Sequence, residues 1–130
     1  MDARSNLAEL NAEARFNEAT LAQLRSLDAM RPGLLQNLVD IFERNTGKLV
    51  DELEAKVAAG ESTSVRASFH TLKGSAGSLG GLRLSKLAAH AETIAGAGDP
   101  EHLLSAVLLS VRAEFVGLRA ALAQLLAAGK

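Results

Sequence analysis

The chain has 130 residues, is 48% hydrophobic, and carries 14 basic and 15 acidic side chains for a net charge of −1. That length suits one domain with its own core, and the hydrophobic fraction excludes a disordered chain. The balanced charge and the absence of Trp and Tyr count against a nucleic-acid surface, which needs basic patches and stacking rings. The absence of cysteine excludes disulfides, thiolate catalysis and zinc fingers.

We expect no targeting or membrane-spanning segment. Its N-terminus, MDARSNLAEL, has no apolar core of a secretory signal, and charged residues interrupt the apolar stretch 103–109 long before a bilayer span is complete. We therefore expect a soluble, cytoplasmic protein. Leucine and alanine outnumber β-branched residues, which favours an all-helical fold.

The N-terminal part predicts two short helices. Leucines at helical spacing indicate the first within residues 3–14, and Asn17 is expected to cap the second, which ends at Pro32-Gly33. Residues 1–15 are interpreted as an N-terminal extension, a linker or a short helix. Residues 16–130 are assigned to one helical-bundle domain.

Four longer helices follow. The first runs from Leu34 to about residue 59 and is stopped by Gly60, and Ser62 is expected to cap the second. The third restarts after residues 80–81. The strongest start signal is 99–101, Asp-Pro-Glu, before a last helix that ends at Gly129. Four helices joined by short loops predict an antiparallel four-helix bundle with one or two short N-terminal accessory helices.

The second of these helices has two faces of different kinds. Its core stripe follows the spacing of three and four residues that a buried helix face requires: Val65, Phe69, Leu72, Ala76 and Leu79. His70 lies opposite the centre of that stripe, and Gly74, Gly77 and Gly81 follow at +4, +7 and +11 on the same side. Each glycine costs about 1 kcal/mol of helix propensity. The register therefore indicates a solvent-facing imidazole that another macromolecule can approach closely.

An accessible imidazole suits phosphoryl transfer. In water an imidazole has a pKa of about 6.5, so around neutrality it offers a nucleophilic nitrogen without needing a general base. Lys73 at +3 places an ammonium beside His70 that could balance phosphoryl charge, and Arg66 at −4 could add to it. No strand precedes the glycines and Lys73 comes before them, so a nucleotide-binding loop is excluded. The residues themselves thus indicate a phosphoryl acceptor read by another protein.

The other two histidines are expected to be structural. His90 falls beside the core stripe of its helix and is expected to be half-buried, and His102, in the first turn of the last helix, is expected to lie on the surface. No pair of ligands has the spacing of a metal site on bundle helices, and no carboxylate cluster of the kind that holds Mg²⁺ is evident. No metal or cofactor of its own is therefore expected.

The stretch HTLKGSAGSLGG, residues 70–81, closely resembles the signature of histidine phosphotransfer (HPt) domains, the intermediates of two-component phosphorelays. The helices on either side are similar to those of the family, and the likeness covers roughly residues 17–125. It implies a four-helix bundle that accepts a phosphoryl group from a receiver-domain aspartate and passes it to another receiver. The receiver would supply Mg²⁺ and the acidic residues. The chain itself would be no autonomous enzyme.

Carried over residue by residue, the resemblance implies that His70 is phosphorylated and that Lys73 lies near the phosphoryl group. Gly74 would leave room for the receiver. The surrounding docking face is predicted to comprise Arg66, Gly74, Gly77, Ser78 and Gly81. Some relatives hold the imidazole with a glutamine of the following helix, but this chain has no glutamine between Gln36 and Gln124. The residue that orients His70 is therefore not identified.

Two alternatives stay open. A helical adaptor could bind a receiver or another partner through the same glycine-lined face without phosphate. A dimerisation domain of a histidine kinase is a weaker alternative, because its helices pair across a dimer beside an ATP domain, whereas we expect a monomer. The chain is either a stand-alone protein or the C-terminal part of a hybrid sensor kinase.

Overall fold

The computed structural model describes residues 3–99 and 102–128, which form six helices. Their bounds are α1 Ala3–Asn11, α2 Glu18–Met30, α3 Leu34–Ala58, α4 Ser62–Ser78, α5 Leu82–Gly96 and α6 Leu104–Ala128. Strand-like pairing within these residues is limited to one isolated antiparallel bridge between Phe16 and Gly81. Among the described helices, none combines the length and hydrophobicity that a bilayer crossing requires.

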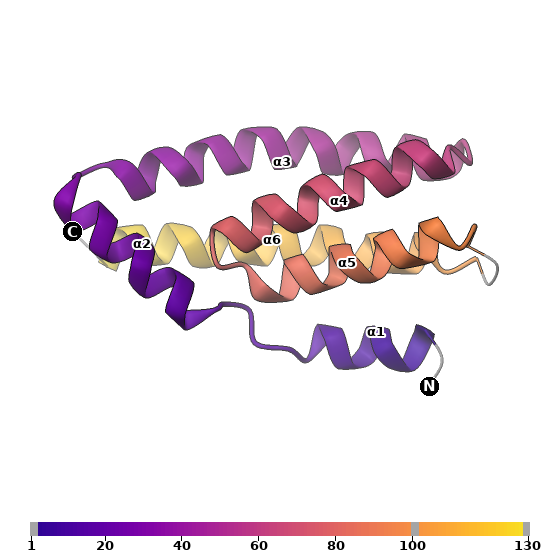
Figure 1. The fold of residues 1–130 in the computed structure, drawn as a ribbon, viewed down its shortest axis with the longest axis horizontal. Coiled ribbons are helices and arrows are strands. Elements are labelled where there is room, and N and C mark those ends of the chain that lie inside the picture. Colours follow the sequence, from indigo (N-terminus) through magenta and orange to yellow (C-terminus); the bar gives the residue numbers. More distant parts are fainter. Residues whose placement is uncertain (1–2, 100–101, 129–130) are drawn as a thin grey trace.

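Helices α3 to α6 run alternately up and down and form the bundle, while α1 lies beside α5 and α2 beside the start of α3 (Figure 1). The predicted all-α fold, an antiparallel four-helix bundle with short N-terminal accessory helices, is confirmed. The core is built from one apolar face of each bundle helix, with Phe69, Leu53, Leu72, Leu84, Leu87 and Leu118 among the largest fully buried side chains. These apolar faces provide the rigid frame that fixes α4 against α5.

Most predicted helix boundaries are confirmed. The Asn17 side chain accepts a hydrogen bond from the backbone N–H of Thr20, as an N-cap should. Gly60 has φ +71° and ends α3 in the left-handed conformation. The prediction that Ser62 caps α4 is wrong, because Ser62 is already its first helical residue and the preceding Glu61 makes no side-chain cap.

The last helix begins later than predicted. Residues 100 and 101 lie outside the described part of the chain, as does the predicted stop at Gly129, and α6 starts at Leu104. Asp99 still acts as a cap, because its carboxylate accepts the backbone N–H groups of Leu103 at 2.7 Å and Leu104 at 3.4 Å. His102 is exposed, as expected, but precedes α6 instead of lying in its first turn.

The segment between α1 and α2 is tied to the bundle by a buried carboxylate. Glu114 of α6 is 5% exposed and accepts hydrogen bonds from Arg15 at 2.9 and 3.2 Å and from Arg83 at 3.1 Å. The hydrogen bond that Arg15 donates to Glu114 is the main cause that raises the pKa of the Arg15 guanidinium. Gly117 makes room for Arg15, since a Cβ there would lie 2.5 Å from its Nη2. The division at residue 15 stays a prediction, although α1 falls within the extension.

Candidate functional site

The predicted two-faced helix is present as α4. All five residues of its core stripe are at most 4% exposed, and the His70 side chain on the opposite side is 67% exposed. The bundle therefore holds His70 on a rigid helix with its ring in solvent. This is the geometry that the sequence predicted for a histidine read by another macromolecule.

The surface beside His70 is open where two of the predicted glycines lie. A Cβ built on Gly74 would meet nothing within 4 Å, and one on Gly77 would meet only Ser85 Oγ at 3.5 Å. Ser78, also predicted to contact a partner, is exposed and donates its hydroxyl to the carbonyl of Gly74 at 2.9 Å. The part of α4 that follows Lys73 thus presents backbone and small side chains to solvent.

The prediction that Gly81 extends this face is wrong. Helix α4 ends at Ser78, and Gly80 with φ +76° turns the chain away before Gly81 is reached. Gly81 is buried, and a Cβ there would lie 2.8 Å from Leu118 Cδ2 and 3.2 Å from the carbonyl oxygen of Ala76. Gly81 is a glycine because α6 packs directly against it, so it belongs to the fold and is not part of the docking face.

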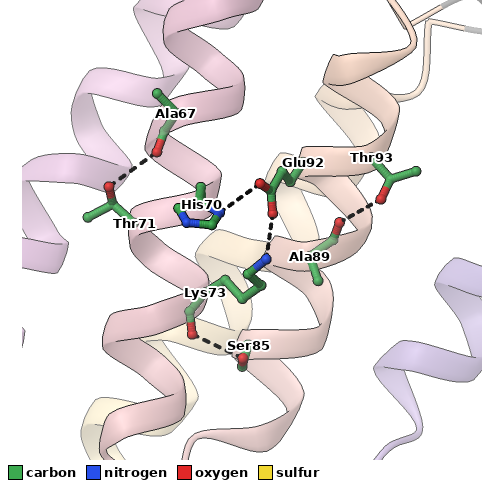
Figure 2. Close-up of polar contacts among 8 residues, drawn as sticks. All are labelled: Ala67, His70, Thr71, Lys73, Ser85, Ala89, Glu92 and Thr93. Atoms are coloured by element: carbon green, nitrogen blue, oxygen red, sulfur yellow. Dashed lines mark hydrogen bonds and ion pairs between the residues drawn. The ribbon is translucent and has the colours of Figure 1, made fainter.

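The residue that holds His70 is Glu92 of α5, which the sequence analysis did not identify (Figure 2). Its carboxylate bridges two residues of α4: Oε2 lies 2.8 Å from His70 Nδ1, and Oε1 accepts a hydrogen bond from Lys73 Nζ at 2.8 Å. Its side chain is only 18% exposed. A glutamate of the following helix, and not a glutamine, therefore holds the imidazole.

The Glu92 contact determines which nitrogen of His70 keeps a free lone pair. A carboxylate can only accept hydrogen bonds, so Nδ1 carries the proton and donates it to Glu92. In the neutral ring this leaves Nε2 without a proton and with its lone pair free. Because the side chain is largely exposed, that lone pair lies on a ring that solvent can reach.

Lys73 keeps Glu92 ionised. Its hydrogen bond is the largest of the causes that hold the pKa of the Glu92 carboxyl below its ordinary value of 4.5, and the hydrogen bond from His70 acts in the same direction. Partial burial opposes this shift without cancelling it. Glu92 thus remains a hydrogen-bond acceptor for His70 throughout the neutral range.

The lowered pKa predicts a specific dependence of stability on pH. A carboxyl whose pKa is lowered by folding contributes stability above its ordinary value of 4.5, and that contribution is lost as pH falls through the folded-state pKa. We expect Glu92→Gln to flatten the decline in unfolding free energy between about pH 7 and about pH 3. Urea unfolding across this range measures it, with Glu52→Gln, an exposed acid of α3, as control. Identical slopes for wild type and Glu92→Gln would contradict the assignment.

The two predicted cations lie on either side of His70 along α4. Lys73 is partly exposed and paired with Glu92, so its predicted role at a phosphoryl group stays a prediction. Arg66 is exposed one turn before His70 and lies against Gly96 at the end of α5, where a Cβ would be 3.4 Å from its Nε. The α4–α5 register is also held by the Ser85 hydroxyl, which donates to the Lys73 carbonyl at 3.0 Å.

The composition of the sequence gives one indication that Glu92 has a special role, whereas the spacing of residues along a single helix gives none. Glu92 is the only acidic residue between Glu61 and Asp99.

His90, on the same helix, is half-buried as expected, and its Nε2 is buried without a hydrogen-bond partner in the described part of the structure. Within residues 3–99 and 102–128, no three acidic, histidine or cysteine side chains are grouped so as to hold a metal ion.

The fold and this site define a small helical bundle that presents an imidazole, held by a carboxylate, to solvent. Residues 37–128 match the model of the Hpt domain family, and the chain belongs to this family of histidine phosphotransfer domains. It is a phosphotransfer module and not a kinase catalytic domain. No curated protein is detectably similar to the chain.

Solved structures share the fold. Histidine-containing phosphotransfer protein B from Pseudomonas aeruginosa PAO1 is similar with a TM-score of 0.76 and 23% identity, over 85% of this chain and 92% of that one. ZmHP2, a histidine-containing phosphotransfer protein from maize, is similar with a TM-score of 0.76 and 23% identity, over 99% of this chain and 100% of that one. A putative histidine-containing phosphotransfer protein from rice is similar with a TM-score of 0.73 and 22% identity, over 95% of this chain and 93% of that one. The likeness to the maize protein extends over the N-terminal helices as well.

Proposed function

We propose that this chain is a phosphorelay intermediate, which accepts a phosphoryl group from the aspartate of one receiver domain onto His70 and passes it to another receiver. The single observation that carries the proposal is the His70–Glu92 contact, which leaves Nε2 free on an exposed ring. The partners are thus receiver domains, which belong either to separate response regulators or to a hybrid sensor kinase. The expected cytoplasmic location and monomeric state belong to the same proposal.

The transfer step needs no base from this chain. The Nε2 lone pair of His70 attacks the phosphorus of the aspartyl phosphate, the bond from phosphorus to the acyl oxygen breaks, and the aspartate leaves as a carboxylate. The proton on Nδ1 stays in place, so the ring becomes cationic while it carries the phosphoryl group. Glu92 stabilises that cation through the hydrogen bond it already makes. Mg²⁺ would come from the receiver, and Lys73 would balance part of the phosphoryl charge.

Transfer from a labelled receiver tests the proposal. The wild-type chain is incubated with a phosphorylated receiver domain and Mg²⁺, and the label on the chain is expected to be acid-labile and base-stable, as a phosphoramidate is. The phosphorylated chain should then lose its label to a second receiver. A chain that binds receivers but never acquires label would support the adaptor instead, and a stable dimer in light scattering would favour a kinase dimerisation domain.

Enlarging Gly74 should separate stability from transfer. Because a side chain there meets open space, Gly74→Leu should fold normally and gain up to about 1 kcal/mol from helix propensity. The same side chain would project into the space that a docked receiver needs, so transfer should drop to near background. Thermal unfolding and the labelling assay measure the two effects, with Ala120→Leu on the exposed side of α6 as control. An unfolded Gly74→Leu variant or one with full transfer would contradict this role.

A further inference from the structure

Arg66 differs from the other lysine, arginine and glutamate side chains of α4 and α5 in having no ion-pair partner among the described residues. Four of them make an ion pair within residues 3–99 and 102–128: Lys73, Arg83, Lys86 and Glu92. Arg66 makes neither an ion pair nor a side-chain hydrogen bond with those residues, and it is exposed. Within the part of the chain that the structure describes, a full positive charge one turn from His70 is therefore uncompensated.

The packing of α4 on α5 explains why Arg66 has no partner among the described residues of these two helices. The two helices are antiparallel, and where Glu92 lies opposite His70, Gly96 lies opposite Arg66, one turn further along α5. A Cβ on Gly96 would lie 3.4 Å from Arg66 Nε and 3.6 Å from its Cζ, so the guanidinium rests on bare backbone. The position opposite His70 holds a carboxylate, whereas the position opposite Arg66 holds no side chain.

We propose that Arg66, seated on Gly96, is a recognition residue that binds a carboxylate on the docking surface of the receiver domain. The inference rests on the proposed function, since it takes the receiver as the partner. Arg66 and His70 are four residues apart, about 6 Å along the helix axis, so a protein that covers one covers the other. Burying an unpaired guanidinium is costly, whereas a carboxylate matches its planar set of donors in a bidentate pair.

Arg66 also lies at the C-terminus of α5, where a cation is favourable for the helix dipole. That role and the proposed one predict different measurements. A purely structural Arg66 would change thermal stability and leave receiver binding unaltered once the variant is folded. A recognition residue would change the dissociation constant for the receiver and its dependence on salt.

The test measures receiver binding and phosphorylation separately. Calorimetry gives the dissociation constant for the receiver that binds wild type best among those of the same genome. We expect Arg66→Ala to raise it about tenfold, Arg66→Glu to raise it further, and Arg66→Lys to restore part of the affinity. Arg44→Ala, an exposed arginine of α3, is the matched control and should bind like wild type.

Direct phosphorylation by phosphoramidate, a small donor that needs no docking, provides the second arm. The Arg66 variants should be labelled at the wild-type rate by phosphoramidate, while transfer from the receiver shows a raised KM and an unchanged plateau. Equal slowing with both donors would place Arg66 at the phosphoryl group and overturn the inference, as would an unchanged dissociation constant. If no phosphate reaches wild type but binding depends on Arg66, the relay fails and the recognition role survives. If no receiver binds wild type, both fail.

Discussion

Replacing His70 by glutamine is expected to abolish the acid-labile label that a phosphorylated receiver leaves on the chain. Glutamine has no nucleophilic nitrogen, so no phosphoramidate bond can form, while its amide can still donate a hydrogen bond to Glu92. Because the side chain is 67% exposed and outside the core, the unfolding free energy should change by no more than about 0.5 kcal/mol. Labelling and urea unfolding of the same preparation measure both.

The chain contains matched controls, because it has three histidines. His90→Gln and His102→Gln should both retain the label, since His90 is half-buried on α5 and His102 lies before α6, away from the α4–α5 contact that holds His70. Undiminished label in His70→Gln, or its loss in either control alone, would reject His70 as the phosphorylated residue.

The part of the site that the sequence predicted lies within single helices. The exposure of His70, the burial of Phe69 and Leu72 on the other side, and the openness at Gly74 all follow from 3.6-residue periodicity. This periodicity requires no knowledge of what α4 packs against. It failed at Gly81 because an ideal helix was extended past Gly80, whose left-handed backbone ends that regularity.

Glu92 could not be derived in the same way, because its role depends on the register between α4 and α5. That register is set by tertiary packing and by contacts such as the Ser85 hydroxyl on the Lys73 carbonyl. The sequence indicates Glu92 only as the single acidic residue in a long stretch without others. Its role becomes evident in the structure, where it contacts both His70 and Lys73.

Outside the apolar core, the buried carboxylate of Glu114 is expected to make the largest single contribution to the free energy of unfolding. Removing one partner of a buried ion pair leaves the other charges uncompensated and costs about 3–5 kcal/mol. Arg15 and Arg83 are 35% and 23% exposed and can partly rehydrate, so we expect Glu114→Ala to lose about 3 kcal/mol, the low end of that range. Urea unfolding measures this loss.

Glu54 gives a comparison at similar geometry but greater exposure. It pairs with Arg112 at 3.0 Å across the surface of α3 and α6 and is 69% exposed, so Glu54→Ala should cost no more than about 1 kcal/mol. Equal losses for Glu54→Ala and Glu114→Ala would contradict the role assigned to burial. Glu114→Gln should fall between them, because it keeps an acceptor but loses the charge.

The Glu114 variant also tests whether the N-terminal segment belongs to the folded unit. Arg83 donates a hydrogen bond to the carbonyl of Glu13 at 2.7 Å, so the Glu114 cluster fixes backbone as well as side chains of the segment before α2. In Glu114→Ala, hydrogen exchange of the Arg83 amide, which bonds the Arg15 carbonyl at 3.3 Å, should accelerate more than that of amides in the middle of α4. His70 should still accept phosphate in the folded fraction, because its contact with Glu92 involves none of these residues. Uniform acceleration across the chain would instead mean that the cluster stabilises the bundle only globally.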